Sequence, residues 1–426
     1  MLKVNQNFIK SKNKNILISN GYKDFHLTSA AKVLLSDKTK LILYSGFFLN
    51  NFFVNFTKFF KINNHKINKL ILRRQGIKNK YLKTFFLGEF LHEIGIIFKN
   101  KFNLKKISDI IIIYSYRLYA NKLQKYINKN KQNINIYHFR AGYGGRSIKT
   151  AKFLGIKTIC DHSIAHPSMI NYMINNGGKF PNKKIKPPNN FWKLVLQDLE
   201  DADFILVNSN FVKKTLVYMN ISFNKIHVIY TGLENKYFRL LKKKNFFQIN
   251  KSKIKFLFVG GVNKRKGFDE IVSAINLLIK NNHNFEFHIV GSLTKEFNDK
   301  YISFLKKSSI KFHGIKNYKE IMDIMYKSDV FVFPSNVEGS ARVIFEAMAC
   351  GCPIITTKNT GSIVKNKENG FIVDSGDYKS VYSAMLKFIN NPGLISLYGK
   401  KNEKIIRQEY HPKKYAEKLI KYYKST

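Results

Sequence analysis

The sequence predicts an α/β protein made of two doubly wound halves. Short apolar runs rich in β-branched and aromatic residues alternate with helix-forming segments along most of the chain, which is typical of parallel sheets with helical crossovers. The clearest single case is residues 329–357, which read DVFVFPSNVEGSARVIFEAMACGCPIITT. This stretch predicts a strand, a loop, a helix and a second strand, and therefore one complete βαβ unit.

Local residue chemistry marks the ends of each element of that unit. The apolar run 330–333 is the first strand, and Pro334 ends it. Helix formers over 342–350 predict the helix, which Gly351 closes at the C-cap position. Residues 353–356 are the second strand. Ligands of parallel sheets collect where such a loop meets the helix N-terminus.

Two acidic residues lie in this unit. Glu338 is in the loop and Glu346 follows eight residues later. At ~100° per residue, a helical path would leave the two carboxylates within about 80° of each other. We therefore expect both acids to face a ligand whose hydroxyls they bind, while its phosphate contacts backbone amides.

The remaining elements follow from the same patterns. A glycine-rich link, AGYGGRS, lies between two of the expected strands and is a weak candidate for a phosphate loop. Ser209 is expected to cap a helix. The expected strands are residues 15–19, 41–44, 134–139, 157–160, 204–207, 226–230, 255–259, 285–290, 311–314 and 370–373, with helices at 27–35, 269–280 and 318–325.

These elements predict a domain organisation of 1–200, 201–400 and a C-terminal helix, 401–426. A chain of 426 residues with 44% hydrophobic residues is long and apolar enough for two cores. Its three cysteines, Cys160, Cys350 and Cys352, make no disulfide framework, which favours a reducing compartment. The N-terminus has no signal-like apolar region, and no run of eighteen apolar residues occurs, so we expect a cytoplasmic protein.

A formal charge of +47 is the most unusual number in the composition. Lysine accompanies Asn, Ile, Tyr and Phe throughout, as A+T-rich codons dictate, so most of this charge is expected to decorate a soluble surface. Its field also attracts anionic lipids and phosphorylated ligands. No nucleic-acid module is present, and we expect no specific nucleic-acid partner. The aromatic, basic residues 47–102 predict amphipathic helices that either pack on the sheet or contact a membrane surface.

A second loop adds cations to the expected site. Residues 260–267, GGVNKRKG, follow a strand, and the amides at Gly260 and Gly261 with the side chains of Lys264, Arg265 and Lys266 can neutralise a diphosphate. The spacing matches neither a dinucleotide fold nor a P-loop. Cations for a phosphate and carboxylates for hydroxyls together describe a site for a sugar nucleotide.

Four stretches of the chain resemble the donor-binding domain of retaining glycosyltransferases of the GT-B fold, family 4 (glycosyl transferases group 1). They are ADFILVNSNFVKKTL, KIHVIYTGLE, FLFVGGVNKRKGF and EGSARVIFEAMACGCPIITTKNTGSIVKNKENGFIV. The last contains the family's Glu-x7-Glu pattern as Glu338 and Glu346. The resemblance implies two Rossmann-like domains that face each other across a cleft, the N-terminal one binding the acceptor and the C-terminal one the donor. It also implies that the C-terminal helix, 401–426, packs back on the N-terminal domain.

The resemblance also implies roles for single residues. Glu346 would bind the nucleotide ribose and Lys266 would bind the diphosphate. Glu338 would lie by the donor sugar and phosphate and is also a candidate catalytic residue. Amides of the helix that follows Gly339 and Ser340 would add donors. One departure is Gly261, where family members often have arginine; Arg265 can supply that charge.

In the first domain, the family commonly places a histidine beside the reacting sugar. His162 after the strand 157–160 is the first candidate for this catalytic position, followed by His166 and then His138. The alternative for each is a buried structural histidine.

The implied reaction moves a sugar from a nucleoside-diphosphate donor to an acceptor hydroxyl with retention, without a metal or a cofactor. The acceptor would be a glycan or a lipid-linked molecule in polysaccharide, lipopolysaccharide or glycolipid synthesis, and the protein would contact the inner face of the membrane peripherally. Two alternatives stay open: a nucleotide-sugar epimerase or phosphorylase, and a non-enzymatic basic protein that binds membranes or nucleic acid.

Overall fold

A computed structural model describes residues 14–23, 25–36, 39–49, 77–244, 246 and 253–426. The chain forms two compact units. Unit 1 comprises the described residues within 1–161, 189–205 and 416–426, and unit 2 comprises those within 162–188 and 206–415. This grouping differs from a division at residue 200, because the segment after the fifth strand packs in unit 2 and the last eleven residues pack in unit 1.

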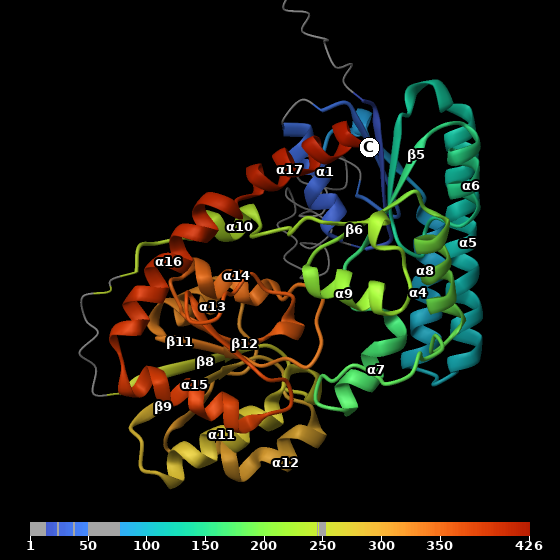
Figure 1. The fold of residues 1–426 in the computed structure, drawn as a ribbon. Coiled ribbons are helices and arrows are strands. Elements are labelled where there is room, and N and C mark those ends of the chain that lie inside the picture. Colours follow the sequence, from blue (N-terminus) through green and yellow to red (C-terminus); the bar gives the residue numbers. More distant parts are fainter. Residues whose placement is uncertain (1–13, 24, 37–38, 50–76, 245, 247–252) are drawn as a thin grey trace, which may run out of the picture. The chain divides into compact units, whose positions relative to one another are not determined.

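Within the described residues, the first sheet has seven strands in the order β3-β2-β1-β4-β5-β6-β7, of which Figure 1 labels β5 and β6. The pairs β1–β2, β1–β4, β2–β3 and β4–β5 are parallel. The strands are β1 (Ile16–Gly21), β2 (Leu41–Ser45), β3 (Leu82–Thr84), β4 (Ile136–Arg140), β5 (Lys157–His162), β6 (Phe204–Val207) and β7 (Ile226–Val228). Between them lie α1 (His26–Ser36), α4 (Phe86–Asn100), α5 (Lys105–Lys129), α6 (Arg146–Phe153), α7 (Pro167–Asn175), α8 (Asn190–Asp201) and α9 (Asn210–Tyr218).

The second sheet has six described strands in the order β10-β9-β8-β11-β12-β13, all paired in parallel. They are β8 (Ile254–Val259), β9 (Phe285–Val290), β10 (Ile310–Phe312), β11 (Val330–Phe333), β12 (Ile354–Thr357) and β13 (Gly370–Val373). The helices are α10 (Asn235–Phe238), α11 (Phe268–Lys280), α12 (Lys295–Leu305), α13 (Tyr318–Lys327), α14 (Arg342–Ala349), α15 (Tyr378–Asn390), α16 (Gly393–Glu409) and α17 (Pro412–Ser425). The strand order reverses between β8 and β11, and ligands of doubly wound sheets bind at such a point.

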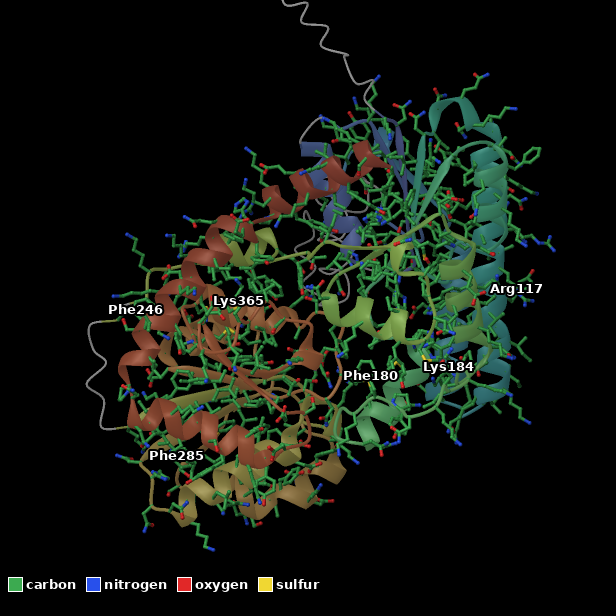
Figure 2. All side chains as sticks on the ribbon, viewed as in Figure 1. Arg117, Phe180, Lys184, Phe246, Phe285 and Lys365 are labelled. Carbon is green, nitrogen blue, oxygen red and sulfur yellow. The ribbon has the colours of Figure 1, made fainter. Side chains whose placement is uncertain are left out.

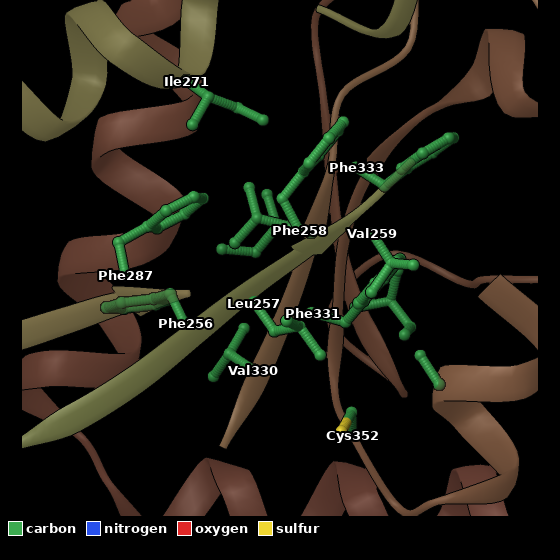
Figure 3. Packing of buried hydrophobic residues seen from close by; sticks show 14 of the residues in the cluster. Phe256, Leu257, Phe258, Val259, Ile271, Phe287, Val330, Phe331, Phe333 and Cys352 are labelled. Carbon is green, nitrogen blue, oxygen red and sulfur yellow. The ribbon is translucent and has the colours of Figure 1, made fainter. Parts of the chain in front are cut away.

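The predicted βαβ unit forms as β11, α14 and β12. The phenylalanines of β8, β9 and β11 stack through the centre of unit 2, where Phe258 and Phe333 lie 5.8 Å apart between ring centroids (Figure 3). Complete burial of these side chains is the main stabilisation of the sheet that presents the site loops.

The glycine-rich link 141–147 does not form an open phosphate loop. The buried carboxylate of Asp198 accepts hydrogen bonds from the amides of Gly142, Gly144 and Gly145 at 2.7–2.8 Å. An acid of the chain itself therefore occupies the amide cradle that the sequence offered as a weak anion site.

The predicted amphipathic segment 47–102 is described only in part, because residues 50–76 lie outside the described residues. Its second half contains the short strand β3, which the sequence pattern did not predict, and the helix α4. All three cysteines are free and buried.

Candidate functional site

Two loops of unit 2 meet at the carboxyl ends of β8 and β11. Residues 260–267 follow β8 and residues 334–341 follow β11, and these neighbouring strands are parallel. The backbone oxygen of Arg265 accepts hydrogen bonds from Ser335 Oγ at 2.7 Å and from the Asn336 amide at 2.8 Å. The side chain of Asn336 donates to Lys264 O at 3.0 Å. These hydrogen bonds join the basic loop (residues 260–267) to the acidic loop (residues 334–341).

The carboxylate of Glu338 lies between the cations of the first loop. Its Oε1 atom is 2.5 Å from both Arg265 Nη1 and Lys266 Nζ, and Ser335 Oγ lies 3.1 Å away. The Glu338 and Lys266 side chains are only 13% and 15% exposed, so water screens their attraction weakly. The structure thus brings together Arg265, Lys266 and Glu338, three of the predicted donor-binding residues.

The contacts around Lys266 fix its position and shift its pKa. Asn263 caps the short turn Lys264–Lys266 by accepting from the Lys266 amide, and Lys266 Nζ lies 4.8 Å from the centre of the Phe333 ring. Burial lowers the pKa of Lys266, Glu338 opposes this shift, and Arg265 adds to it. Gly267 then enters α11 with φ 69°, and a Cβ there would lie 2.1 Å from Pro334 O. Only glycine fits this turn between the two loops.

Glu346 has surroundings different from those of Glu338, which corrects the expected geometry. Helix α14 begins at Arg342, so Glu338 precedes the helix and the calculation of a shared helical side does not apply. Glu346 lies in the second turn of α14 and is 8% exposed. Burial, followed by the carboxylate of Glu346, raises the pKa of the neighbouring Tyr237. The two acids therefore have different neighbours, as different roles require.

Gly339 brings a further segment to the acidic loop. A Cβ at this residue would lie 1.8 Å from Ser163 O, so the two backbones touch in a way that excludes any side chain. Ser209 Oγ, which caps α9 as predicted, donates to Gly339 O, and Asn208 Nδ2 donates to Ser163 O at 3.1 Å. His162 immediately precedes Ser163 and is buried in the same unit.

The other two histidine candidates have structural surroundings. His166 caps α7 by accepting from the Ser168 amide, and burial lowers the pKa of His166 to about 4. His138 belongs to unit 1, where its Nδ1 lies 2.8 Å from Tyr423 Oη and its Nε2 lies 3.4 Å from Asp161. Of the three, His162 is the one whose chain neighbour touches the loop of Glu338.

The remaining predicted residues lie at the ends of the two loops. Gly260 and Gly261 open the basic loop directly after β8, and half-buried Ser340 lies just before α14. Sequence reasoning did not single out Ser163, Ser335, Asn336 or Tyr237. Ser209 was predicted only as a helix cap, and Asn208 was noted only within a stretch that carries the resemblance. The polar pair after a strand was the available signal.

Comparison with known proteins finds a family that resembles the part of the chain that contains this site. Residues 241–412 match the family model described as "Glycosyl transferases group 1". This part of the chain therefore resembles the group 1 glycosyltransferase family, as the motifs predicted.

Individual relatives agree with that assignment. The capsular polysaccharide biosynthesis glycosyltransferase CapM of Staphylococcus aureus is 29% identical over 217 residues, which cover 48% of this chain and 54% of CapM. The chain thus spans about half the length of the relatives that it matches.

Solved structures extend the likeness to nearly the whole chain. HepE of Anabaena, solved with UDP and glucose, superposes with a TM-score of 0.58 at 13% identity, covering 97% of this chain and 100% of HepE. Sucrose-phosphate synthase of Thermosynechococcus elongatus gives a TM-score of 0.66 at 14% identity over 97% and 99% of the two chains. These likenesses concern the fold, and they confirm the predicted GT-B class with its two Rossmann-like sheets.

Proposed function

We propose that this protein is a retaining glycosyltransferase that moves a sugar from a nucleoside-diphosphate donor to an acceptor hydroxyl. The observation that carries the proposal is the cluster of Arg265, Lys266 and Glu338 at the topological switch point of a group 1 glycosyltransferase domain. Two cations fixed on a tight turn match the charge of a diphosphate leaving group.

Each residue has a distinct part in this proposal. Lys266 and Arg265 neutralise the diphosphate as the glycosidic bond breaks, and amides before α14 add hydrogen bonds. Glu346 binds the ribose hydroxyls, since a buried carboxylate accepts two such bonds at once. Glu338 lies by the donor sugar and phosphate, and His162 is the proposed catalytic residue beside the reacting sugar.

The names of the similar proteins guide the choice of substrates. CapM is named for capsular polysaccharide biosynthesis, and HepE was solved with UDP. We propose a nucleotide sugar as donor and a glycan or lipid-linked acceptor, in the synthesis of a polysaccharide, lipopolysaccharide or glycolipid. The described part of the chain contains no helix long and apolar enough to cross a membrane.

The test is a turnover assay with UDP-, GDP- and ADP-sugars and a mixture of glycan and lipid-linked acceptors. We expect acceptor-dependent release of one nucleoside diphosphate and, by NMR, a product with the donor's anomeric configuration. Lys266→Met is expected to abolish release. Lys300→Met, which removes an exposed lysine paired with Asp269, serves as the matched control.

The same assay separates the alternatives. An epimerase would isomerise the donor without releasing the diphosphate. A phosphorylase would need inorganic phosphate and would yield a sugar phosphate. An absence of turnover and of binding with every nucleotide sugar would favour a non-enzymatic protein.

A further inference from the structure

Helix α4 exposes several of its large apolar side chains, whereas a helix that packs on a sheet normally buries them. The side chains of Phe86, Phe90 and Ile97 are 54%, 49% and 49% exposed. Steps of four and seven residues keep these three on one face of the helix. The residues that α4 buries are small or polar: Gly88, Glu89, His92 and Gly95.

Helix α5 repeats the reversal in its first half. Ile107, Ile110 and Tyr114 share one face and are 44%, 68% and 58% exposed. The same half buries two serines, Ser108 and Ser115, along with Tyr116. Helices α4 and α5 pack against each other, so their exposed stripes belong to one hairpin (Figure 1).

Specific contacts fix both helices in these orientations. The Glu89 carboxylate accepts hydrogen bonds from the amides of Lys23 at 2.9 Å and Phe47 at 2.5 Å. Tyr22 Oη donates to Ser115 O at 2.6 Å. A Cβ on Gly95 would lie 2.7 Å from Ile112 Cγ1, which shows how closely the helices approach. The apolar stripes are therefore held outward by buried polar contacts on the opposite faces.

Lysines surround the apolar stripes where the two helices join. Residues 97–108 read IFKNKFNLKKIS, with four lysines and no acid. All four lysines are exposed, and so are the intervening Phe102 and Leu104 at 55% and 43%. Arg117 adds an exposed cation further along α5 (Figure 2). We name the surface of Phe86, Phe90, Ile97, Phe102, Leu104, Ile107, Ile110, Tyr114 and these lysines the α4–α5 face.

The charge of this face distinguishes between two kinds of apolar partner. The cores of protein–protein interfaces are depleted in lysine. At a bilayer surface, lysine extends its ammonium to anionic headgroups while its methylenes and neighbouring aromatic residues enter the acyl boundary. We propose that the α4–α5 face docks on an anionic lipid bilayer and lies in its interfacial layer. The proposal does not depend on the glycosyltransferase reaction.

Sedimentation of the full chain with vesicles tests this proposal. The vesicles are phosphatidylcholine alone or phosphatidylcholine with about one third phosphatidylglycerol. The wild type is expected to bind the anionic vesicles, and Phe102→Ser/Ile107→Ser/Ile110→Ser is expected to lower the partition coefficient about tenfold or more. Phe153→Ser, at a 91% exposed phenylalanine of α6 outside the face, is the matched control and is expected to bind like the wild type.

A charge variant keeps the test valid if the triple variant folds poorly. Replacing Lys99, Lys101, Lys105 and Lys106 by Gln is expected to weaken binding to anionic vesicles and to flatten its salt dependence. The proposal is overturned if the wild type stays in the supernatant with anionic vesicles, or if a folded triple variant binds as the wild type does. It is also overturned if light scattering shows a wild-type dimer that the triple variant dissociates and neither protein binds vesicles, since a second copy would then cover this face.

Discussion

Lys266 Nζ and Glu338 Oε1 lie 2.5 Å apart, although the two residues belong to loops that follow different strands. The same oxygen pairs with Arg265 Nη1. A single carboxylate of the chain therefore pairs with both cations of the basic loop. In our account, a donor diphosphate competes with Glu338 for these cations.

Replacing Glu338 by glutamine tests that competition. Glu338→Gln is expected to bind a nucleoside diphosphate about 3–10-fold more tightly, because the competing charge is removed, and to turn over more slowly. Isothermal titration and steady-state kinetics measure the two effects. Glu368→Gln, at an exposed acid paired with Lys401, is the control. Weaker diphosphate binding by Glu338→Gln would mean that the carboxylate instead organises the cations.

Replacing Glu346 tests recognition of the ribose. Glu346→Ala is expected to cost about 2–3 kcal/mol of binding free energy for a nucleoside diphosphate, because a charged hydrogen-bond acceptor is lost. Inorganic pyrophosphate has no ribose, so its affinity should stay the same. Titrations with both ligands check this. An equal loss for pyrophosphate would show that Glu346 acts on the phosphates or on the fold.

Replacing Gly339 by alanine tests the close approach of the acidic loop to Ser163. Gly339→Ala is expected to lower the free energy of unfolding by about 2–3 kcal/mol, because a Cβ there would lie 1.8 Å from a backbone oxygen. Gly393→Ala is the matched control, since nothing lies within 4 Å of its Cβ position at the start of α16. Denaturant titration measures both variants. Equal stability of the two would contradict the contact.

The pH dependence of the free energy of unfolding tests whether burial keeps His166 neutral. Its pKa is about 4 in the folded chain, against about 6.5 for an unfolded histidine. Between these pH values the unfolded chain binds a proton that the folded chain does not, so stability is lost as the pH falls from 6.5 toward 4. His166 should contribute a loss of about 2 kcal/mol between pH 7.5 and pH 5.

The variant His166→Asn isolates this contribution, because asparagine also caps helices but does not titrate. Its free energy of unfolding should fall less than that of the wild type over the same pH interval, by about 2 kcal/mol. Parallel pH profiles of the two proteins would show that His166 is not held neutral by burial.

The sequence predicted the helices and strands that a few neighbouring residues are enough to specify. Strands such as 330–333 are continuous apolar runs, and Gly351 and Ser209 carry the chemistry of helix ends. The short strand β3 was missed because Leu82–Thr84 is a mostly exposed edge strand without an apolar run. The glycine-rich link was ambiguous because its partner, Asp198, lies more than fifty residues away in the chain.

The candidate site was predictable in composition and not in arrangement. The basic loop and the two acids were identified, but phosphate and hydroxyl roles were assigned without the pairing of Glu338 to Lys266, which depends on adjacent strands β8 and β11. The calculation that placed Glu338 and Glu346 on one helical side was wrong because Glu338 lies before the helix, which begins at Arg342 as the sequence predicted. The contact of Gly339 with Ser163 joins segments that no spacing rule relates.

The most direct test of the central claim is the thermal stability of the full chain with UDP, GDP or ADP. A ligand at about a hundred times its dissociation constant stabilises the folded state by about 2.7 kcal/mol. We expect one of the three to raise the melting temperature of the wild type and of Lys300→Met, and to raise that of Lys266→Met far less. No shift with any diphosphate, or an equal shift in Lys266→Met, would contradict a nucleoside-diphosphate site at Lys266 and Glu338.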